Sequence, residues 1–262
     1  MKKNLLIYLP ALIIVLAVKV FYQTADSDAL AWILTPTSYW VRILSGISFE
    51  NVPHVGYVNH DYRFIIAASC SGVRFLLITF VMMVCSFTYR ISSMRQKTLW
   101  LFCSAVLSYI LTIFVNGIRI TVSIYLPIIL TAHNLMGKQI TAEQLHTIIG
   151  TSIYFSSLFI IYYFTGKLCS RFFAQSSPLL PSKNRHPFIA PVFWYFVMVL
   201  GLPFLVRLYR GDWEGFSQYA LLVTGICALV TAAFFLLCRL RSLTFSLYAC
   251  ILKTVKCARH LC

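Results

Sequence analysis

Three side chains of this 262-residue sequence have the types that acyl transfer requires: a thiol, a guanidinium and an imidazole. Cys70 lies in the stretch AASCSGVRFLLITF, at the edge of a long apolar run, and Arg119 and His146 follow in later segments. A thiolate is a nucleophile, and a nearby cation favours it over the thiol. Arginine stays charged and stabilises an oxyanion, and histidine transfers protons near neutral pH. The trio therefore predicts attack on a carbonyl followed by protonation of the leaving group.

The segments that carry these residues are too apolar for a soluble domain. Hydrophobic residues make up 60% of the chain, charged residues only 11%, and the mean hydropathy is +0.81. A hydrocarbon core about 30 Å thick needs about 20 helical residues. Six such runs predict an all-α integral membrane protein with transmembrane helices near residues 5–22, 64–87, 98–118, 147–166, 188–206 and 218–238.

The charges predict how these helices are oriented. Of the 22 Lys and Arg residues, 14 fall in alternate connecting segments, and all seven acidic residues fall in the other segments. Lys and Arg concentrate on the cytoplasmic side, so both termini are expected there. A basic inner face against anionic lipid accounts for the net charge of +15, and no nucleic-acid partner is predicted.

Helix rise places the three candidate residues at one depth. Cys70, Arg119 and His146 each lie 17 to 20 residues from the cytoplasmic end of their own helix, which is about 26 to 30 Å. Three different helices thus bring them to the outer boundary. Of the nine cysteines, only Cys70 is expected on that side, which favours a free thiol over a disulfide.

Other interpretations of these residues stay open at this point. A membrane cysteine taken alone is more often a small packing residue, and Arg74 can extend to the interface. An arginine within a membrane helix is nevertheless a candidate site residue, because it needs a partner or water. The outer face has no H-E-x-x-H motif and no Cys or His pair at ligand spacing, so neither a metal nor a cofactor is predicted.

Two regions have less regular patterns. In the outer segment 23–63 we expect an interfacial or short membrane-embedded helix over LAWILTPTSYWVRILSGI, interrupted near Pro36. We also expect a small hairpin in FENVPHVGYVNHDYRF whose His54, His60 and Asp61 are solvated. The run 98–130 is too long for one untilted crossing. We expect Pro127 to kink or end it, with an outer or re-entrant portion beyond the crossing.

Three sequence blocks resemble the signature blocks of the exosortase/archaeosortase family, in the same order and with similar spacing. They are SCSGVRFL around Cys70, NGIRI at Asn116 to Ile120, and His146 opening a later spanning helix. The resemblance covers roughly residues 60–166. It implies a multi-pass cysteine protease-transpeptidase, a hydrolase of peptide bonds, that acts on secreted proteins with a C-terminal sorting tail. Such a tail has a short motif, a spanning helix and a basic cluster.

The resemblance also implies a role for each residue. Cys70 would be the nucleophile, Arg119 the transition-state stabiliser and His146 the general acid/base, with Arg74 and Asn116 supporting them or positioning substrate. The expected partners are tail-bearing secreted proteins and membrane lipid. The expected location is the inner membrane of the cell, with the active site toward the outer, periplasmic face. The common form of the first block has an acidic residue shortly before the cysteine, where this chain has alanines.

We expect three parts along the chain. Residues 1–173 form a catalytic membrane domain with four spans, 174–187 form a Ser/Pro-rich cytoplasmic linker, and 188–262 form a two-helix hairpin with a basic cytoplasmic tail. Two other function classes are weighed against the enzyme. One is a transporter or channel for an anionic solute, and the other is an acyl- or glycosyltransferase that uses a lipid-linked donor.

Overall fold

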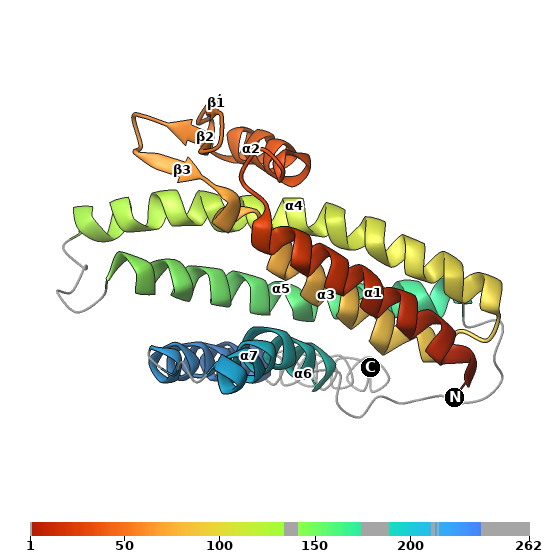
Figure 1. Ribbon diagram of the computed structural model, residues 1–262. Coiled ribbons are helices and arrows are strands. Elements are labelled where there is room, and N and C mark those ends of the chain that lie inside the picture. Colours follow the sequence, from red (N-terminus) through yellow and green to blue (C-terminus); the bar gives the residue numbers. More distant parts are fainter. Residues whose placement is uncertain (1, 134–140, 174–188, 211–212, 214, 237–262) are drawn as a thin grey trace, which may run out of the picture. The chain divides into compact units, whose positions relative to one another are not determined.

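The computed structural model describes residues 2–133, 141–173, 189–210, 213 and 215–236. The chain forms two compact units, Met1–Glu214 and Gly215–Cys262. In the second unit the helix Phe216–Leu236 is described. The elements of the first unit (Figure 1) are α1 (Lys2–Thr24), α2 (Ala31–Ser45), β1 (Glu50–Val52), β2 (Gly56–Asn59), β3 (Phe64–Ile66), η1 (Ala68–Cys70), α3 (Val73–Phe87), η2 (Thr88–Arg90), α4 (Met94–Ala132), α5 (Ala142–Phe173), α6 (Ile189–Phe196), η4 (Val197–Gly201) and α7 (Leu202–Arg210).

Six helical segments are long and apolar enough to cross a membrane, which confirms the prediction of an all-α multi-pass protein. They are Asn4–Thr24, Ala68–Arg90, Met94–Ala132, Gln144–Phe172, Ile189–Leu208 and Phe216–Leu236. The predicted start of the second span at residue 64 is wrong. Residues Phe64–Ile66 form a strand, because a short apolar run fits a half-buried strand as well as a helix.

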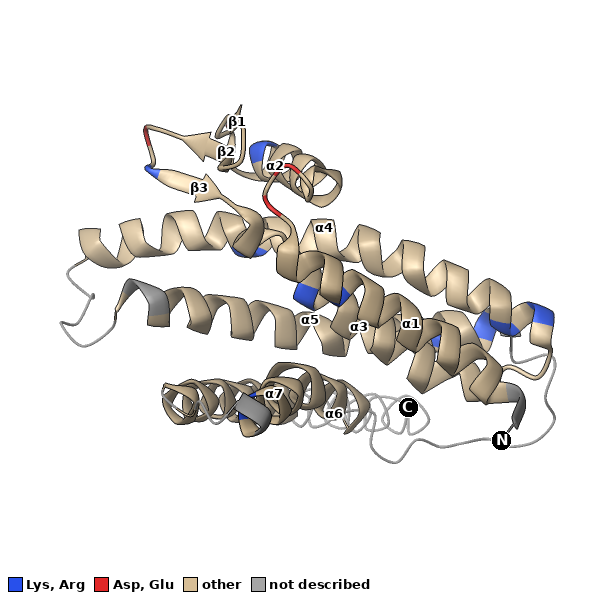
Figure 2. Cartoon of the chain, viewed as in Figure 1, with Lys and Arg blue, Asp and Glu red and all other residues tan. Residues whose placement is uncertain are grey.

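Among the described residues, Asp26, Asp28, Glu50 and Asp61 lie in the loop between α1 and α2 or in the small sheet and its turns. Figure 2 shows red segments in the loop between α1 and α2 and at the turn between β2 and β3, where Asp26, Asp28 and Asp61 are found. Lys97, near the start of α4, is buried and donates to Oδ1 of Asn4 on α1. The cytoplasmic location of both termini stays a prediction.

Helix α4 is one continuous helix of 39 residues, about 58 Å long. The expectation that Pro127 could end it is wrong, because Pro127 lies inside the helix and five further residues follow. A proline removes only one backbone donor, and Ser and Thr side chains can satisfy backbone groups around it. Thr131 Oγ1 donates to the carbonyl of Pro127 at 2.8 Å.

Helix α2 is also continuous, so the expected interruption near Pro36 is wrong. The donor that Pro36 lacks would have bonded to the carbonyl of Trp32, four residues earlier. That carbonyl accepts the hydroxyl of Tyr109 on α4 instead, at 2.7 Å. The two helices meet closely, because a Cβ at Gly117 would lie 2.3 Å from Cδ1 of Trp40.

The outer segment contains the expected hairpin and one further strand. The three strands form an antiparallel sheet in the order β1, β2, β3, with Asn51 opposite Tyr57 and Val58 opposite Ile65. The Asn59 amide donates to the carbonyl of Ser48 at 2.8 Å. The sheet thus connects α2 directly to the segment that leads into η1.

A stripe of small polar side chains lies along the buried face of α4. Ser104, Ser108, Thr112 and Asn116 follow at four-residue spacing and all are buried. Ser108 and Thr112 donate to carbonyls of their own helix, at 2.9 and 2.7 Å. Small side chains with satisfied hydroxyls allow close approach of helices within a bilayer. Helices α3 and α5 pack against α4, and the stripe ends at Asn116, one of the candidate residues.

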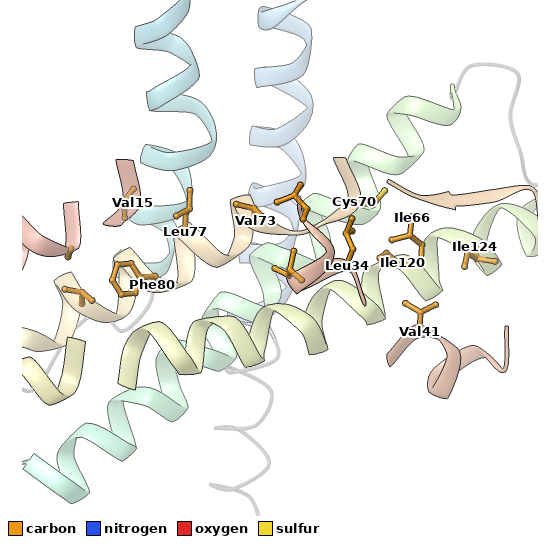
Figure 3. Packing of buried hydrophobic residues seen from close by; sticks show 14 of the residues in the cluster. Val15, Leu34, Val41, Ile66, Cys70, Val73, Leu77, Phe80, Ile120 and Ile124 are labelled. Atoms are coloured by element: carbon orange, nitrogen blue, oxygen red, sulfur yellow. The ribbon is translucent and has the colours of Figure 1, made fainter. Parts of the chain in front are cut away.

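One hydrophobic cluster joins α1, α2, β3, α3 and α4 around Cys70. Figure 3 labels Cys70 between Val73 and Ile66, with Leu34 and Ile120 nearby. Helix α6 packs against α3 and α5. The expected linker 174–187 lies outside the described residues, so the predicted division into a catalytic domain and a separate hairpin stays a prediction.

Candidate active site

Cys70 ends a single 3-10 turn that precedes α3. Its backbone N–H donates to the carbonyl of Ala67 at 2.8 Å, and the N–H of Ser71 donates to Ala68 at 3.1 Å. Gly72 then adopts φ +75°, a left-handed conformation that costs other residues energy, and α3 begins at Val73. Cys70 is therefore presented by a turn and is not part of the α3 helix.

The residues before Cys70 are held by hydrogen bonds that involve the loop between α1 and α2 and the hairpin. The Ala68 N–H donates to Oγ of Ser27 at 3.2 Å, and Ser27 donates in turn to the carbonyl of Val55 at 3.0 Å. The hydroxyl of Tyr22, near the end of α1, reaches the carbonyl of Ala68 at 3.5 Å. The turn that carries Cys70 is thus fixed by the α1–α2 loop and by the hairpin.

Helix α4 brings Asn116 and Arg119 to Cys70 from one face. Nδ2 of Asn116 donates to the carbonyl of Cys70 at 2.6 Å, and Nη1 of Arg119 donates to Oδ1 of Asn116 at 3.2 Å. Asn116 thus links the guanidinium of Arg119 to the backbone of Cys70. Both α4 residues are buried, and a Cβ at Gly72 would lie 2.9 Å from Cγ of Asn116. The glycine therefore leaves room for the amide that holds the cysteine backbone.

Helix α5 completes the cluster with a ladder of residues at four-residue spacing. Nη2 of Arg119 contacts Nε2 of His146, and Nη1 donates to the hydroxyl of Tyr154 at 3.1 Å. Gly150 lies between the two, where a Cβ would be 3.3 Å from Nε of Arg119. Residues four apart share one face of a helix, so α5 surrounds the guanidinium from one side.

The hydrogen bonds show which atoms of His146 and Arg119 donate and which accept. Arginine has only donors, so Nε2 of His146 is the acceptor in this contact and carries no proton. Among the described residues, no hydrogen bond joins the Cys70 thiol to His146. Nε of Arg119 is buried and has no partner in the described part of the chain. The cluster thus carries a permanent positive charge, and the N–H at Nε of Arg119 is available to donate to a further group.

Arg74 is the one candidate that the structure leaves outside this cluster. Its side chain is exposed on α3, and it makes no hydrogen bond or ion pair within the described residues. It follows Cys70 by four positions, but the left-handed Gly72 lies between them and no helix spans both residues. Spacing along a helix therefore does not relate the two side chains.

Sequence reasoning missed Gly150 and Tyr154. The hydroxyl of Tyr154 donates to Oδ1 of Asn116 at 2.7 Å, so this residue contacts both functional residues of α4. A tyrosine in an apolar helix resembles a packing residue, and a glycine resembles a packing gap. Their signal is position, because they follow His146 by four and eight residues and therefore lie on its face.

A second polar cluster lies outside the site, at the hairpin. Nδ1 of His54 is 3.0 Å from Asp26 and 3.2 Å from Asp28, and all three side chains are exposed. Hydrogen bonding by the Ala29 N–H and by His54 lowers the pKa of Asp26, and the same contact raises the pKa of His54. Among the described residues this is the group whose spacing could hold a metal ion. His54 is solvated as expected, and its Nδ1 also contacts both carboxylates; we call this group of three side chains the clasp.

Comparison with known families gives one match. The family model described as transmembrane exosortase (Exosortase_EpsH) matches residues 4–163, which is more than half of the chain and includes the whole cluster. Curated proteins and solved structures give no match. The chain therefore belongs to the transmembrane exosortase family, whose members are in general cysteine-type sorting transpeptidases of membranes.

Proposed function

We propose that this protein is a cysteine protease-transpeptidase that removes C-terminal sorting tails from secreted proteins. The observation that carries the proposal is the position of Arg119. One buried guanidinium contacts Asn116, His146 and Tyr154 at once, and Asn116 in turn holds the backbone of Cys70, in a chain of the exosortase family. The site would lie at the outer face of the inner membrane, where the residues just before a tail's spanning helix would reach it.

Cys70 acts as the nucleophile. Arg119, linked to the Cys70 backbone through Asn116, brings a permanent positive charge to the turn that carries Cys70. The thiolate attacks the carbonyl carbon of the scissile peptide bond, a C–S bond forms, and the carbonyl electrons move to the oxygen. The Asn116 amide holds the backbone carbonyl of Cys70 and so limits how far the attacking sulfur can move.

Arg119 stabilises the oxyanion that results. Its Nη atoms are engaged with Asn116, Tyr154 and His146, whereas Nε is buried and lacks a partner within the described residues. An unpaired buried donor costs free energy, and an oxyanion would recover it in the transition state. The guanidinium is held before the substrate arrives, which is the condition for effective electrostatic stabilisation.

His146 handles the protons. It accepts the proton of the Cys70 thiol and donates it to the leaving amine as the C–N bond breaks, which releases the tail and leaves a thioester on Cys70. Since Nε2 faces Arg119 in the resting structure, this transfer needs a rotation of the imidazole or a water molecule between the two side chains. Water or an acceptor amine then attacks the thioester, and the Cys70 thiolate departs.

Tail processing in cells tests this proposal. The full chain is co-expressed with tail-bearing secreted proteins, and the mass of each mature protein shows whether its tail is removed. We expect removal by the wild type, loss of removal in Cys70→Ala, and at most slow removal in Cys70→Ser. Cys103→Ala is the matched control, because Cys103 is exposed on α4 and is expected to process normally. Tail removal by Cys70→Ala at the wild-type rate would exclude Cys70 as the nucleophile.

A further inference from the structure

The hydroxyl of Tyr154 makes two hydrogen bonds that the proposed acyl transfer does not use. It accepts from Nη1 of Arg119 at 3.1 Å and donates to Oδ1 of Asn116 at 2.7 Å. A phenol has a single proton, and a guanidinium only donates, so the direction of both bonds is fixed. The hydroxyl thus joins the residue proposed to stabilise the oxyanion to the residue that holds the nucleophile's backbone.

Packing leaves the Tyr154 ring little freedom to move. It stacks on Phe75 with ring centroids 4.6 Å apart and an interplanar angle of 18°. The guanidinium carbon of Arg119 lies 5.4 Å from the ring centroid, on the side that favours a cation. Because Phe75 belongs to α3, the ring connects α3, which follows the Cys70 turn, to α4 and α5.

The hydroxyl also determines which way the Asn116 amide faces. Oδ1 of Asn116 accepts from both Tyr154 and Arg119, so Nδ2 must be the end that donates to the carbonyl of Cys70. Without the hydroxyl, Oδ1 loses the shorter of its two bonds, and Arg119 loses one of its acceptors. Each of the two residues would then gain freedom next to Cys70.

We propose that Tyr154 is a positioning residue for tail cleavage, whose hydroxyl holds Arg119 and Asn116 in the orientation in which they serve Cys70. The proposal rests on the proposed function. Tyr154 does not contact the reacting atoms and acts through the other two residues. Its effect on the thiol must therefore depend on Arg119, which distinguishes positioning from a general contribution to folding.

The test measures Cys70 reactivity in the purified full chain, without any substrate. The probe is iodoacetamide at fixed pH, and mass spectrometry follows alkylation of the peptide that contains Cys70. Tyr154→Phe keeps the ring and its stack on Phe75 and removes only the hydroxyl. The matched control is Tyr163→Phe on the same helix, whose side chain is exposed. Alkylation of Cys103, which is exposed on α4, is the internal reference for the activity of the reagent.

We expect Tyr154→Phe to slow alkylation of Cys70 about three- to tenfold, because without the hydroxyl Arg119 and Asn116 are no longer held in one orientation beside the Cys70 turn. Tyr163→Phe and the Cys103 rate should remain unchanged. In an Arg119→Lys background, Tyr154→Phe should change the Cys70 rate by less than about twofold. Equal rates for Tyr154→Phe and Tyr163→Phe, or a full effect in the Arg119→Lys background, would overturn the positioning role.

Tail processing by the same variants separates this inference from the proposed function. We expect Tyr154→Phe to remove a tail about tenfold more slowly than the wild type at equal protein levels in the membrane. Normal processing by Cys70→Ala would refute the proposed function, whereas the alkylation result would still stand. Normal processing by Tyr154→Phe, with Cys70→Ala inactive, would refute the positioning role alone.

Discussion

Replacing Gly150 by alanine should separate the stability of this protein from its activity. Gly150 lies within α5, between His146 and Tyr154, and a Cβ there would be 3.3 Å from Nε of Arg119. At that distance the guanidinium must shift by a few tenths of an ångström. The shift affects the donor that we propose for the oxyanion.

The magnitude follows from two opposing effects. Alanine inside a helix is favoured over glycine by about 1 kcal/mol, so the fold should not be weakened. Misplacing a catalytic group by 1 Å costs roughly 100-fold in rate, so a few tenths of an ångström should cost about four- to tenfold. Gly166→Ala is the matched control on the same helix, because its Cβ would lie 3.6 Å from the Phe87 ring, an ordinary contact.

The assay is the rate of tail removal at matched amounts of membrane protein, together with the thermal stability of each variant. We expect Gly166→Ala to process at the wild-type rate and Gly150→Ala to process about four- to tenfold more slowly, with both at least as stable as the wild type. Equal processing rates for the two variants would refute the proposal that the position of the Arg119 guanidinium limits the reaction.

Two further predictions concern Arg119 and the clasp of His54 with Asp26 and Asp28. Arg119→Lys keeps the charge but cannot serve Asn116, Tyr154 and His146 together, so tail removal should fall at least about 100-fold with the protein still present in the membrane; near-normal activity would exclude its role. The clasp of His54 on Asp26 should be strongest between the lowered pKa of Asp26, below 3.8, and the raised pKa of His54, above 6.5. Its stabilisation is lost as the pH rises through the raised pKa of His54 or falls through the lowered pKa of Asp26. Hydrogen exchange in residues 50–59, corrected for intrinsic rates, should therefore be faster at pH 8.5 than at pH 6 in the wild type and independent of pH in His54→Gln. Equal corrected rates in the wild type would contradict it.

The long apolar runs predicted the spans because length and composition alone decide whether a helix can cross a bilayer. Helix rise was likewise enough to place Cys70, Arg119 and His146 at one level, and the structure brings them together through Arg119 and Asn116. Local sequence failed where tertiary contacts decide. The donor missing at Pro36 is compensated by a tyrosine from another helix, and no pattern near Pro36 contains that information.

The arrangement of the site residues was less predictable from the sequence than their identity. The four-position spacing of Cys70 and Arg74 fits one helical turn, but the left-handed Gly72 separates the cysteine turn from the helix. Tyr154 has no polar neighbour in sequence that marks it, because its partners come from α4. The spacing shows that Tyr154 and His146 share a face of α5, but only the contact with Arg119 shows that this face belongs to the site.

The most direct test of the account is a search for a covalent intermediate on Cys70. Wild-type protein is incubated with a tail-bearing substrate that it processes, the reaction is stopped with acid, and the peptide containing Cys70 is analysed by mass spectrometry. The account predicts a thioester between Sγ of Cys70 and the new C-terminus of the substrate, released by hydroxylamine and absent from Cys70→Ala. Tail removal that proceeds in Cys70→Ala, with no adduct on Cys70 in the wild type, would contradict it.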